Sequence, residues 1–315
     1  MPYLVFRSIF RRPVFRVRII RRKPCQNYLI MRNLAVHILC GGFGFFYAFI
    51  CFLTPFQDDF IPCPQIFLRV FQQAKAAVFP DILNGRTAAF QTFYDKCKTL
   101  GIVSPTYSWG LPVIVTEFLQ RLDLSHRPDY IFFIATYGTT PGQTGRFADN
   151  ILALKGLPLS AKFSVKMPDT WTPIFDLSNK EKVQQINDNA EPEIDYIIKQ
   201  IKNFVVGDFM KNKLPYPLAR IGYNIEYDSM RKTKHFSVED TCVGCGLCAK
   251  NCPISAIKLK DRKPEWIKEQ CVMCLACLHH CPKFAIQYGK NTKKHGQYVH
   301  SLDLRGENLC HKKDN

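Results

Sequence analysis

CVGCGLCAKNCP, residues 242–253, places four cysteines with two, two and three residues between them and ends on a proline. CVMCLACLHHCP, residues 271–282, repeats this spacing and the final proline 29 positions later. The likeness continues past the cysteines, because PISAI (253–257) matches PKFAI (282–286). The chain therefore contains an internal duplication of one small cysteine-rich unit.

The spacing of these cysteines predicts iron-sulfur clusters. Zinc needs only four tetrahedral thiolates, and its ligands usually come as two CxxC pairs separated by a longer loop. Three cysteines at two-residue gaps, followed by a fourth and a proline, form the bacterial iron-sulfur pattern, in which the fourth cysteine ligates the other cluster. Two zinc sites remain the alternative metal assignment.

Interleaved ligation divides the eight thiolates between two [4Fe-4S] clusters, since three cysteines of one run join the last cysteine of the other. One cluster is expected on Cys242, Cys245, Cys248 and Cys281, and the other on Cys271, Cys274, Cys277 and Cys252. Shared ligation holds two clusters close enough for electron exchange. The unit is therefore predicted to conduct electrons.

The residues between the cysteines suit a cluster site. Gly244 and Gly246 allow a tight backbone curl that directs N–H groups at sulfur. His279 and His280 are expected to be exposed loop residues, because the cysteines already fill all eight ligand positions. Apolar side chains are expected to exclude water from the clusters, namely Val243, Leu247, Ile257, Val272, Leu275 and Ile286.

From residue 98 onward, apolar patterns typical of strands and helices alternate. Residues 99–104, 130–136 and 161–167 are predicted strands, and residues 112–122 and 144–154 are predicted helices. This order implies an α/β layer with a parallel sheet and right-handed crossovers.

The chain continues with a long helical stretch, in which Ser178 and Glu181 form a capping-box signature. Pro192 is expected to interrupt this helix or to start a second one. Residues 210–232 are predicted to be a basic linker, with docking of an acidic redox partner as the alternative. Residues 291–315 are predicted to be a polar tail.

Two loops at the ends of predicted strands are candidates for ligand binding. In open parallel sheets, ligands bind beyond the carboxyl ends of the strands. Loops 105–112 and 137–145 each place an aromatic residue beside hydroxyls and glycines, and Trp109 and Tyr137 are expected to stack on a flat ring such as an isoalloxazine. The same aromatic residues can equally cap a core. The full candidate set is Thr106, Tyr107, Ser108, Trp109, Gly110, Tyr137, Gly138 and Thr139.

From about residue 98 to residue 298 the sequence resembles the flavodoxin-ferredoxin fusion proteins of anaerobic bacteria. The motifs that carry the resemblance are GIVSPTYSWGLP, FIATYGTTPGQTGRFA, SVKMPDTWTPIFDLS, GDFMKNK, RKTKHF, YGKNTKKHGQY and the two cysteine runs. The resemblance implies an incomplete α/β flavodoxin-like domain at 98–209, with three recognisable strands. It also implies a small α+β 2[4Fe-4S] ferredoxin domain at 233–290, with repeats at about 233–262 and 263–290.

The same resemblance implies an FMN site, with loops 105–110 and 137–142 around the flavin ring. Flavodoxin-like domains also begin with a strand and a Ser/Thr-Gly loop that holds the flavin phosphate. The only glycine cluster before residue 98, CGGFGFF (40–46), has no hydroxyl partner. We therefore expect no phosphate cradle, and expect the missing first and second strands to leave the edge of strand 99–104 unpaired.

Residues 1–97 differ in composition from the rest of the chain. They contain ten of the 17 arginines, 15 of the 25 phenylalanines and no glutamate. The uncharged run 34–56 is long enough to cross a bilayer as a helix. Two interpretations stay open: a displaced reading frame or mispredicted start, and a membrane anchor that keeps the redox domains in the cytoplasm.

The predicted function is electron transfer through two [4Fe-4S] clusters in the cytoplasm. The net charge of +17 favours an anionic partner, but basic and aromatic residues do not alternate near the cysteines, so redox proteins are expected as partners and nucleic acid is not. A zinc-stabilised nucleic-acid binder is the remaining alternative of another class. No constellation of catalytic acid, base and nucleophile is evident, which favours an electron carrier or an oxidoreductase component.

Overall fold

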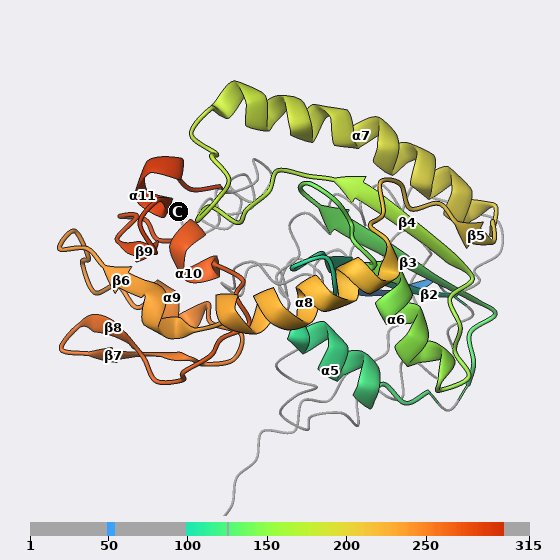
Figure 1. The fold of residues 1–315 in the computed structure, drawn as a ribbon, viewed down its shortest axis with the longest axis horizontal. Helices are drawn as coiled ribbons and strands as arrows, with labels where there is room; N and C mark the ends of the chain where they lie inside the picture. Colours follow the sequence, from blue (N-terminus) through green and yellow to red (C-terminus); the bar gives the residue numbers. More distant parts are fainter. Residues whose placement is uncertain (1–48, 54–98, 125, 299–315) are drawn as a thin grey trace, which may run out of the picture. The chain divides into compact units, whose positions relative to one another are not determined.

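The structure is a computed structural model, and it describes residues 49–53, 99–124 and 126–298. It contains a five-stranded sheet flanked by helices and, after helix α8 (Tyr216–Met230), a small cysteine-rich unit with two two-stranded sheets (Figure 1). The α/β layer with a parallel sheet is therefore confirmed.

The sheet has the strand order β1-β2-β3-β4-β5. Strands β2 to β5 are parallel, in a register that pairs Thr99 with Tyr130 and Phe132 with Ala161. The five strands are β1 (Phe49–Leu53), β2 (Thr99–Pro105), β3 (Tyr130–Tyr137), β4 (Ala161–Lys166) and β5 (Gly207–Asp208).

The expectation that the edge of β2 is unpaired is wrong. Strand β1 pairs along its whole length with β2, from Phe49 opposite Val103 to Leu53 opposite Thr99. The pairing is antiparallel, so β1 satisfies the backbone donors and acceptors of this edge without being the parallel strand that a flavodoxin-like domain has there.

Helices cover both faces of the sheet. Helices α5 (Val113–Arg121) and α6 (Thr144–Ala153) pack on one face, where their apolar side chains meet Leu100, Ile102 and Phe133. Helix α7 (Lys180–Lys202) packs on the other face, against Val103, Ile134 and Phe163. Successive strand residues point to opposite faces, so one apolar run supplies both cores.

Helix α7 begins and continues differently from the sequence prediction. Its N-cap is Asn179, whose side chain accepts the Lys182 N–H at 2.8 Å, so the expected Ser178 cap is displaced by one residue. Pro192 lies inside the continuous helix. A buried apolar row that includes Ala190 and Ile194 packs on the sheet, and this packing offsets the backbone hydrogen bond that the proline removes.

The predicted linker contains helix α8 (Tyr216–Met230), which leads from the sheet to the cysteine-rich unit (Figure 1). Tyr227 is buried; its hydroxyl accepts the Val113 N–H at 3.1 Å and lies 3.3 Å from the Val272 carbonyl, to which it donates. Tyr223 donates to the Leu111 carbonyl at 2.6 Å. One helix therefore joins the end of the β2 loop to the second cysteine run.

The cysteine-rich unit is built from short elements. Strands β6 (Phe236–Val238) and β9 (Ile286–Tyr288) form one antiparallel pair, and β7 (Ile257–Lys260) and β8 (Lys263–Trp266) form the other. The short helices are η1 (Thr233–His235), α9 (Leu247–Lys250), α10 (Ala276–His279) and α11 (Thr292–His295).

The apolar run 34–56 falls within the described residues only at Phe49–Leu53, which form strand β1. The rest of that run, the remainder of residues 1–97 and the tail from residue 299 lie outside the described residues. Among the helices of the described segments, none has both the length and the apolar character needed to cross a membrane.

Candidate metal centres and the adjoining cavity

The structure gathers the eight cysteines around two separate cavities, and all eight are free thiols. Each cavity is lined by three cysteines of one run and the last cysteine of the other, which are the two sets that the sequence spacing groups together. The first cavity is lined by Cys242, Cys245, Cys248 and Cys281, and the second by Cys252, Cys271, Cys274 and Cys277.

The backbone of the two runs follows the same path, including its strained positions. Gly244 and Gly246 have φ of 67° and 77°, and the residues 29 positions later, Met273 and Leu275, have φ of 60° and 54°. Left-handed conformations of this kind favour glycine, because a Cβ crowds the neighbouring carbonyl oxygen. The curl predicted from two glycines therefore recurs in the second run without them.

Backbone N–H groups point at several cysteine sulfurs. The amides of Ala256, Met273 and Ala285 donate to the Sγ atoms of Cys252, Cys271 and Cys281 at 3.1, 3.3 and 3.2 Å. Such donors stabilise charge on metal-bound sulfur and tune reduction potential.

Burial raises the pKa of Cys248 and of Cys271 to about 11. A thiol with so high a pKa stays protonated at neutral pH, so a thiolate at these positions requires a bound cation.

A zinc ion and a [4Fe-4S] cluster differ in how closely their four cysteine sulfurs approach one another. Among the described residues, no three His, Cys, Asp or Glu side chains are grouped so as to hold one metal ion. Four zinc thiolates must converge on one centre at about 2.3 Å. In a [4Fe-4S] cube each thiolate binds a different iron, so the four sulfurs stand further apart.

The two cysteine-lined cavities differ in exposure. Cys245 is exposed, and beside it Val243 and Leu247, two of the side chains expected to exclude water, line the first cavity while remaining 48% and 38% exposed. In the second run Val272 is 4% and Leu275 3% exposed. Val272 belongs to the core formed by α5, α6 and the sheet and also lines the second cavity.

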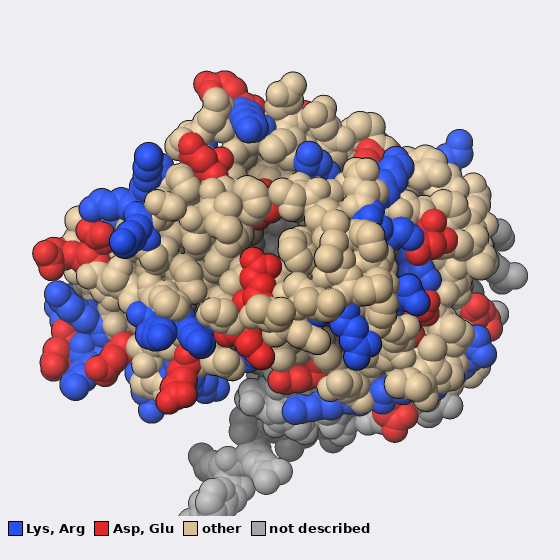
Figure 2. Space-filling view, viewed as in Figure 1, with Lys and Arg blue, Asp and Glu red and all other residues tan. Residues whose placement is uncertain are grey.

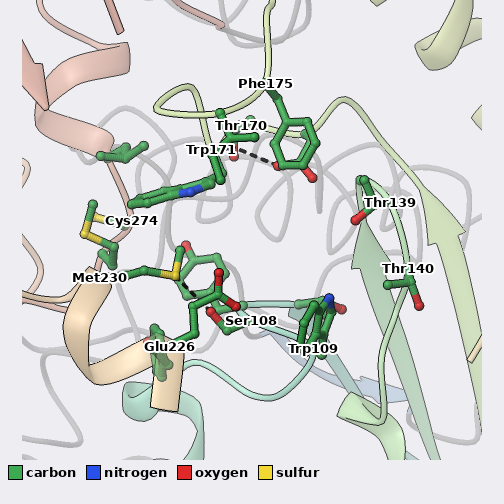
Figure 3. A pocket seen from close by; sticks show the side chains of 18 residues that line it. Ser108, Trp109, Thr139, Thr140, Thr170, Trp171, Phe175, Glu226, Met230 and Cys274 are labelled. Carbon is green, nitrogen blue, oxygen red and sulfur yellow. Dashed lines mark hydrogen bonds between the residues drawn. The ribbon is translucent and has the colours of Figure 1, made fainter. Parts of the chain in front are cut away.

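A larger cavity of about 280 Å³ adjoins the second cysteine-lined cavity. Loops after β2, β3 and β4 form it together with α8 and the second cysteine run. In Figure 3, Thr170, Trp171 and Phe175 lie on one side of the open centre and Ser108, Trp109 and Glu226 on the other, with Cys274 and Met230 at one end and Thr139 and Thr140 at the opposite end.

Most of the predicted ring-binding residues line this cavity, namely Thr106, Tyr107, Ser108, Trp109, Gly138 and Thr139. Gly110 and Tyr137 do not. Tyr137 is buried at the end of β3, and a Cβ on Gly110 would meet Tyr223 at 2.5 Å, so this glycine permits close packing behind the cavity.

The loop after β4 supplies a wall that the sequence analysis did not assign to the site. Asp169, Thr170 and Trp171 line the cavity, followed by Ile174 and Phe175. The rule that pointed to the first two loops applies here too, because residues 168–175 follow the carboxyl end of a parallel strand and carry an aromatic residue beside hydroxyls.

Asp169 is an acidic side chain in the lining of the large cavity. Its carboxylate accepts the Trp171 N–H at 3.1 Å, and a Cβ on Gly138 would lie 2.2 Å from it, so only glycine fits beneath it. Burial raises the pKa of Asp169 above its usual value, and the Trp171 hydrogen bond opposes this shift.

Three side chains, one in the second cysteine run and two after it, hold the β4 loop by hydrogen bonds to its backbone carbonyls. His279 Nε2, His295 Nδ1 and Asn291 Nδ2 donate to the carbonyls of Thr170, Thr172 and Pro173 at 3.0, 2.6 and 3.2 Å. The cavity wall is thus attached to the cysteine-rich unit.

His279 is buried in helix α10, so its predicted exposure is wrong; His280 beside it is half-buried. The Tyr298 N–H donates to His279 Nδ1 at 3.2 Å, which leaves the proton on Nε2. Burial lowers the pKa of His279 to about 4, consistent with a neutral ring.

Residues 234–282 match the family of 4Fe-4S dicluster domains. The chain thus carries a ferredoxin-type iron-sulfur domain, which supports electron transfer through iron-sulfur clusters. Comparison with curated proteins and with solved structures finds no match to the chain.

Proposed function

We propose that the chain is an electron carrier in which two [4Fe-4S] clusters connect an external redox protein to a flavin-type ring bound in the large cavity. The observation that carries this proposal is the place of Cys274, which lines both the second cysteine cavity and the large cavity. A cluster ligand in the wall of a ring-sized cavity permits electron transfer without a diffusing intermediary.

In this proposal the two clusters have different roles. The cluster on Cys242, Cys245, Cys248 and Cys281 faces solvent and exchanges electrons with the external protein, because Cys245 is exposed. The cluster on Cys252, Cys271, Cys274 and Cys277 is the inner one, since Cys271 and Cys277 are buried. The shared ligation of the two runs then joins the exposed site to the covered one.

The cavity supports a flavin ring as its occupant. Its volume of about 280 Å³ lies just below the usual range of small-molecule sites, about 300–1,000 Å³. Trp109 and Trp171 offer faces for stacking, and hydroxyls such as Thr139 offer hydrogen bonds to a polar ring edge. A bound FMN would supply coupling between one-electron and two-electron steps. The α/β domain is in this proposal flavodoxin-like.

Anaerobic purification tests the proposal, with iron, acid-labile sulfide, zinc and released flavin all quantified. We expect about eight irons and about eight sulfides per chain, as two cubane clusters require. Stoichiometric flavin is expected in the purified protein or after incubation with it. Zinc without sulfide would refute the cluster assignment. A full iron content with no flavin bound after incubation would refute the flavin assignment alone.

A further inference from the structure

The charge of the large cavity limits which part of a flavin it recognises. Among the described residues, eighteen line this cavity, and they include the carboxylates of Asp169 and Glu226 but no Lys, Arg or His. Figure 2 likewise shows acidic side chains beside the hollow in the middle of this face. The charged side chains that the described part of the chain places in this lining would therefore repel a dianionic phosphate.

Two of the cations that lie near the cavity walls in sequence already have partners. Arg231, which follows Met230, donates to the Cys271 carbonyl at 2.8 Å and pairs with Asp228 at 3.2 Å. Lys180, beyond the β4 loop, donates to the carbonyls of Leu177 and Gln297 at 3.2 and 2.9 Å. Neither side chain is a lining residue.

The backbone amides at the start of helix α6 have partners as well. Gly142, Gln143 and Thr144 donate to Thr140 Oγ1, the Trp109 carbonyl and the Pro141 carbonyl at 3.1, 2.9 and 3.2 Å. The first amide of α5, on Val113, donates to the Tyr227 hydroxyl. The amides that usually cradle a phosphate beside a parallel sheet are therefore engaged at these two helices.

The remaining groups suit an uncharged planar ring. Indole faces stack on such a ring, hydroxyls bond its carbonyls, and carboxylates accept its N–H groups. We propose that the cavity recognises the flavin ring and not the phosphate, so that riboflavin binds as tightly as FMN. This inference rests on the flavin assignment of the proposed function and specifies its ligand class.

Titration of the cluster-loaded, flavin-free full chain with riboflavin and with FMN tests the inference, with quenching of flavin fluorescence as the readout. We expect dissociation constants within about threefold of each other, because one good charge-assisted phosphate contact would already give about tenfold or more. Raising the salt concentration should leave the riboflavin-to-FMN ratio unchanged.

Trp171→Leu provides a second measurement, since it removes an indole face and no charge. We expect it to weaken both ligands by the same factor. FMN binding at least about thirtyfold tighter than riboflavin, or a Trp171→Leu loss confined to FMN, would overturn the inference and leave the flavin assignment standing. Failure of both ligands to bind a chain with full iron content would overturn the flavin assignment and the inference with it.

Discussion

Val243 and Val272 occupy the same position in the two cysteine runs, 29 residues apart, yet Val243 is 48% exposed and Val272 is 4% exposed. Val272 belongs to the core around α5 and α6, whereas Val243 lines the outer cysteine cavity beside exposed Cys245. The duplicated unit is therefore asymmetric in its surroundings although it is symmetric in its local sequence.

This pair allows a matched stability test. Val272→Ala removes a buried side chain and should lower the free energy of unfolding by about 2 kcal/mol. Val243→Ala should change it by less than about 0.5 kcal/mol, because the side chain is half in solvent. Anaerobic thermal unfolding of the cluster-loaded variants measures both. Equal effects at the two positions would contradict the packing described for Val272.

The interleaved grouping of cysteines predicts a pattern of iron loss. Cys252→Ala and Cys271→Ala remove ligands of the same cluster, so either variant and the double variant should each keep about four irons per chain. Cys252→Ala combined with Cys281→Ala removes one ligand from each cluster and should keep almost none. Iron and sulfide analysis after anaerobic purification measures these contents. If each run instead held its own cluster, the Cys252→Ala, Cys271→Ala double variant would lose a ligand from both clusters and keep almost no iron.

At Gly244 the backbone is left-handed, and the backbone of Arg262 lies close to it. A Cβ there would lie 2.5 Å from the Arg262 carbonyl oxygen. Gly289 has nearly the same φ, 66°, but nothing lies within 4 Å of its Cβ position.

Gly289→Ala should therefore cost only the backbone strain, about 1–2 kcal/mol. Gly244→Ala should lower the unfolding midpoint further and reduce cluster content. If the two variants lose the same amount of stability and of cluster content, backbone strain alone explains the glycine at position 244, and the nearby Arg262 carbonyl does not contribute.

Asp169 predicts a pH-dependent stability. Its folded-state pKa is raised by burial, so its contribution to stability is greatest below the unfolded pKa and falls as the pH rises through the folded pKa. Asp169→Asn should therefore raise the unfolding midpoint at pH 8, and this gain should shrink as the pH falls to 5. The Asn side-chain oxygen still accepts the Trp171 N–H.

Asp176 provides a control, because its pKa is shifted in the direction opposite to that of Asp169. Hydrogen bonds from Ser178 lower the pKa of its exposed carboxylate, so its contribution is present at neutral pH and disappears as the pH falls through its folded pKa. Asp176→Asn should leave the midpoint unchanged or slightly lower at pH 8. A gain at pH 8 from both variants would point to general charge reduction instead of the burial of Asp169.

The helices and strands predicted from hydrophobic periodicity agree with the structure where the local sequence pattern and the tertiary packing favour the same secondary structure. Strands β2, β3 and β4 and helices α5 and α6 lie within a residue or two of their predicted bounds. Pro192 was predicted to interrupt a helix because the local rule disfavours proline there, but burial of the α7 face on the sheet is the stronger effect.

The candidate cavity was only partly foreseeable. Trp109 and Thr139 follow predicted strands and could be placed by the rule for parallel sheets. Glu226 and Met230 come from α8, and their position depends on how that helix packs between the sheet and the cysteine-rich unit. No local pattern encodes such a contact between segments distant in sequence.

The sequence alone determined the grouping of the cysteines and the parallel sheet, because ligand spacing and hydrophobic periodicity are local properties of the chain. Only the tertiary structure decided which cysteine set is covered and that Cys274 borders the large cavity. The two runs share one local pattern, so their difference arises from what packs against them: Val272 enters the core beside α5, and Val243 does not.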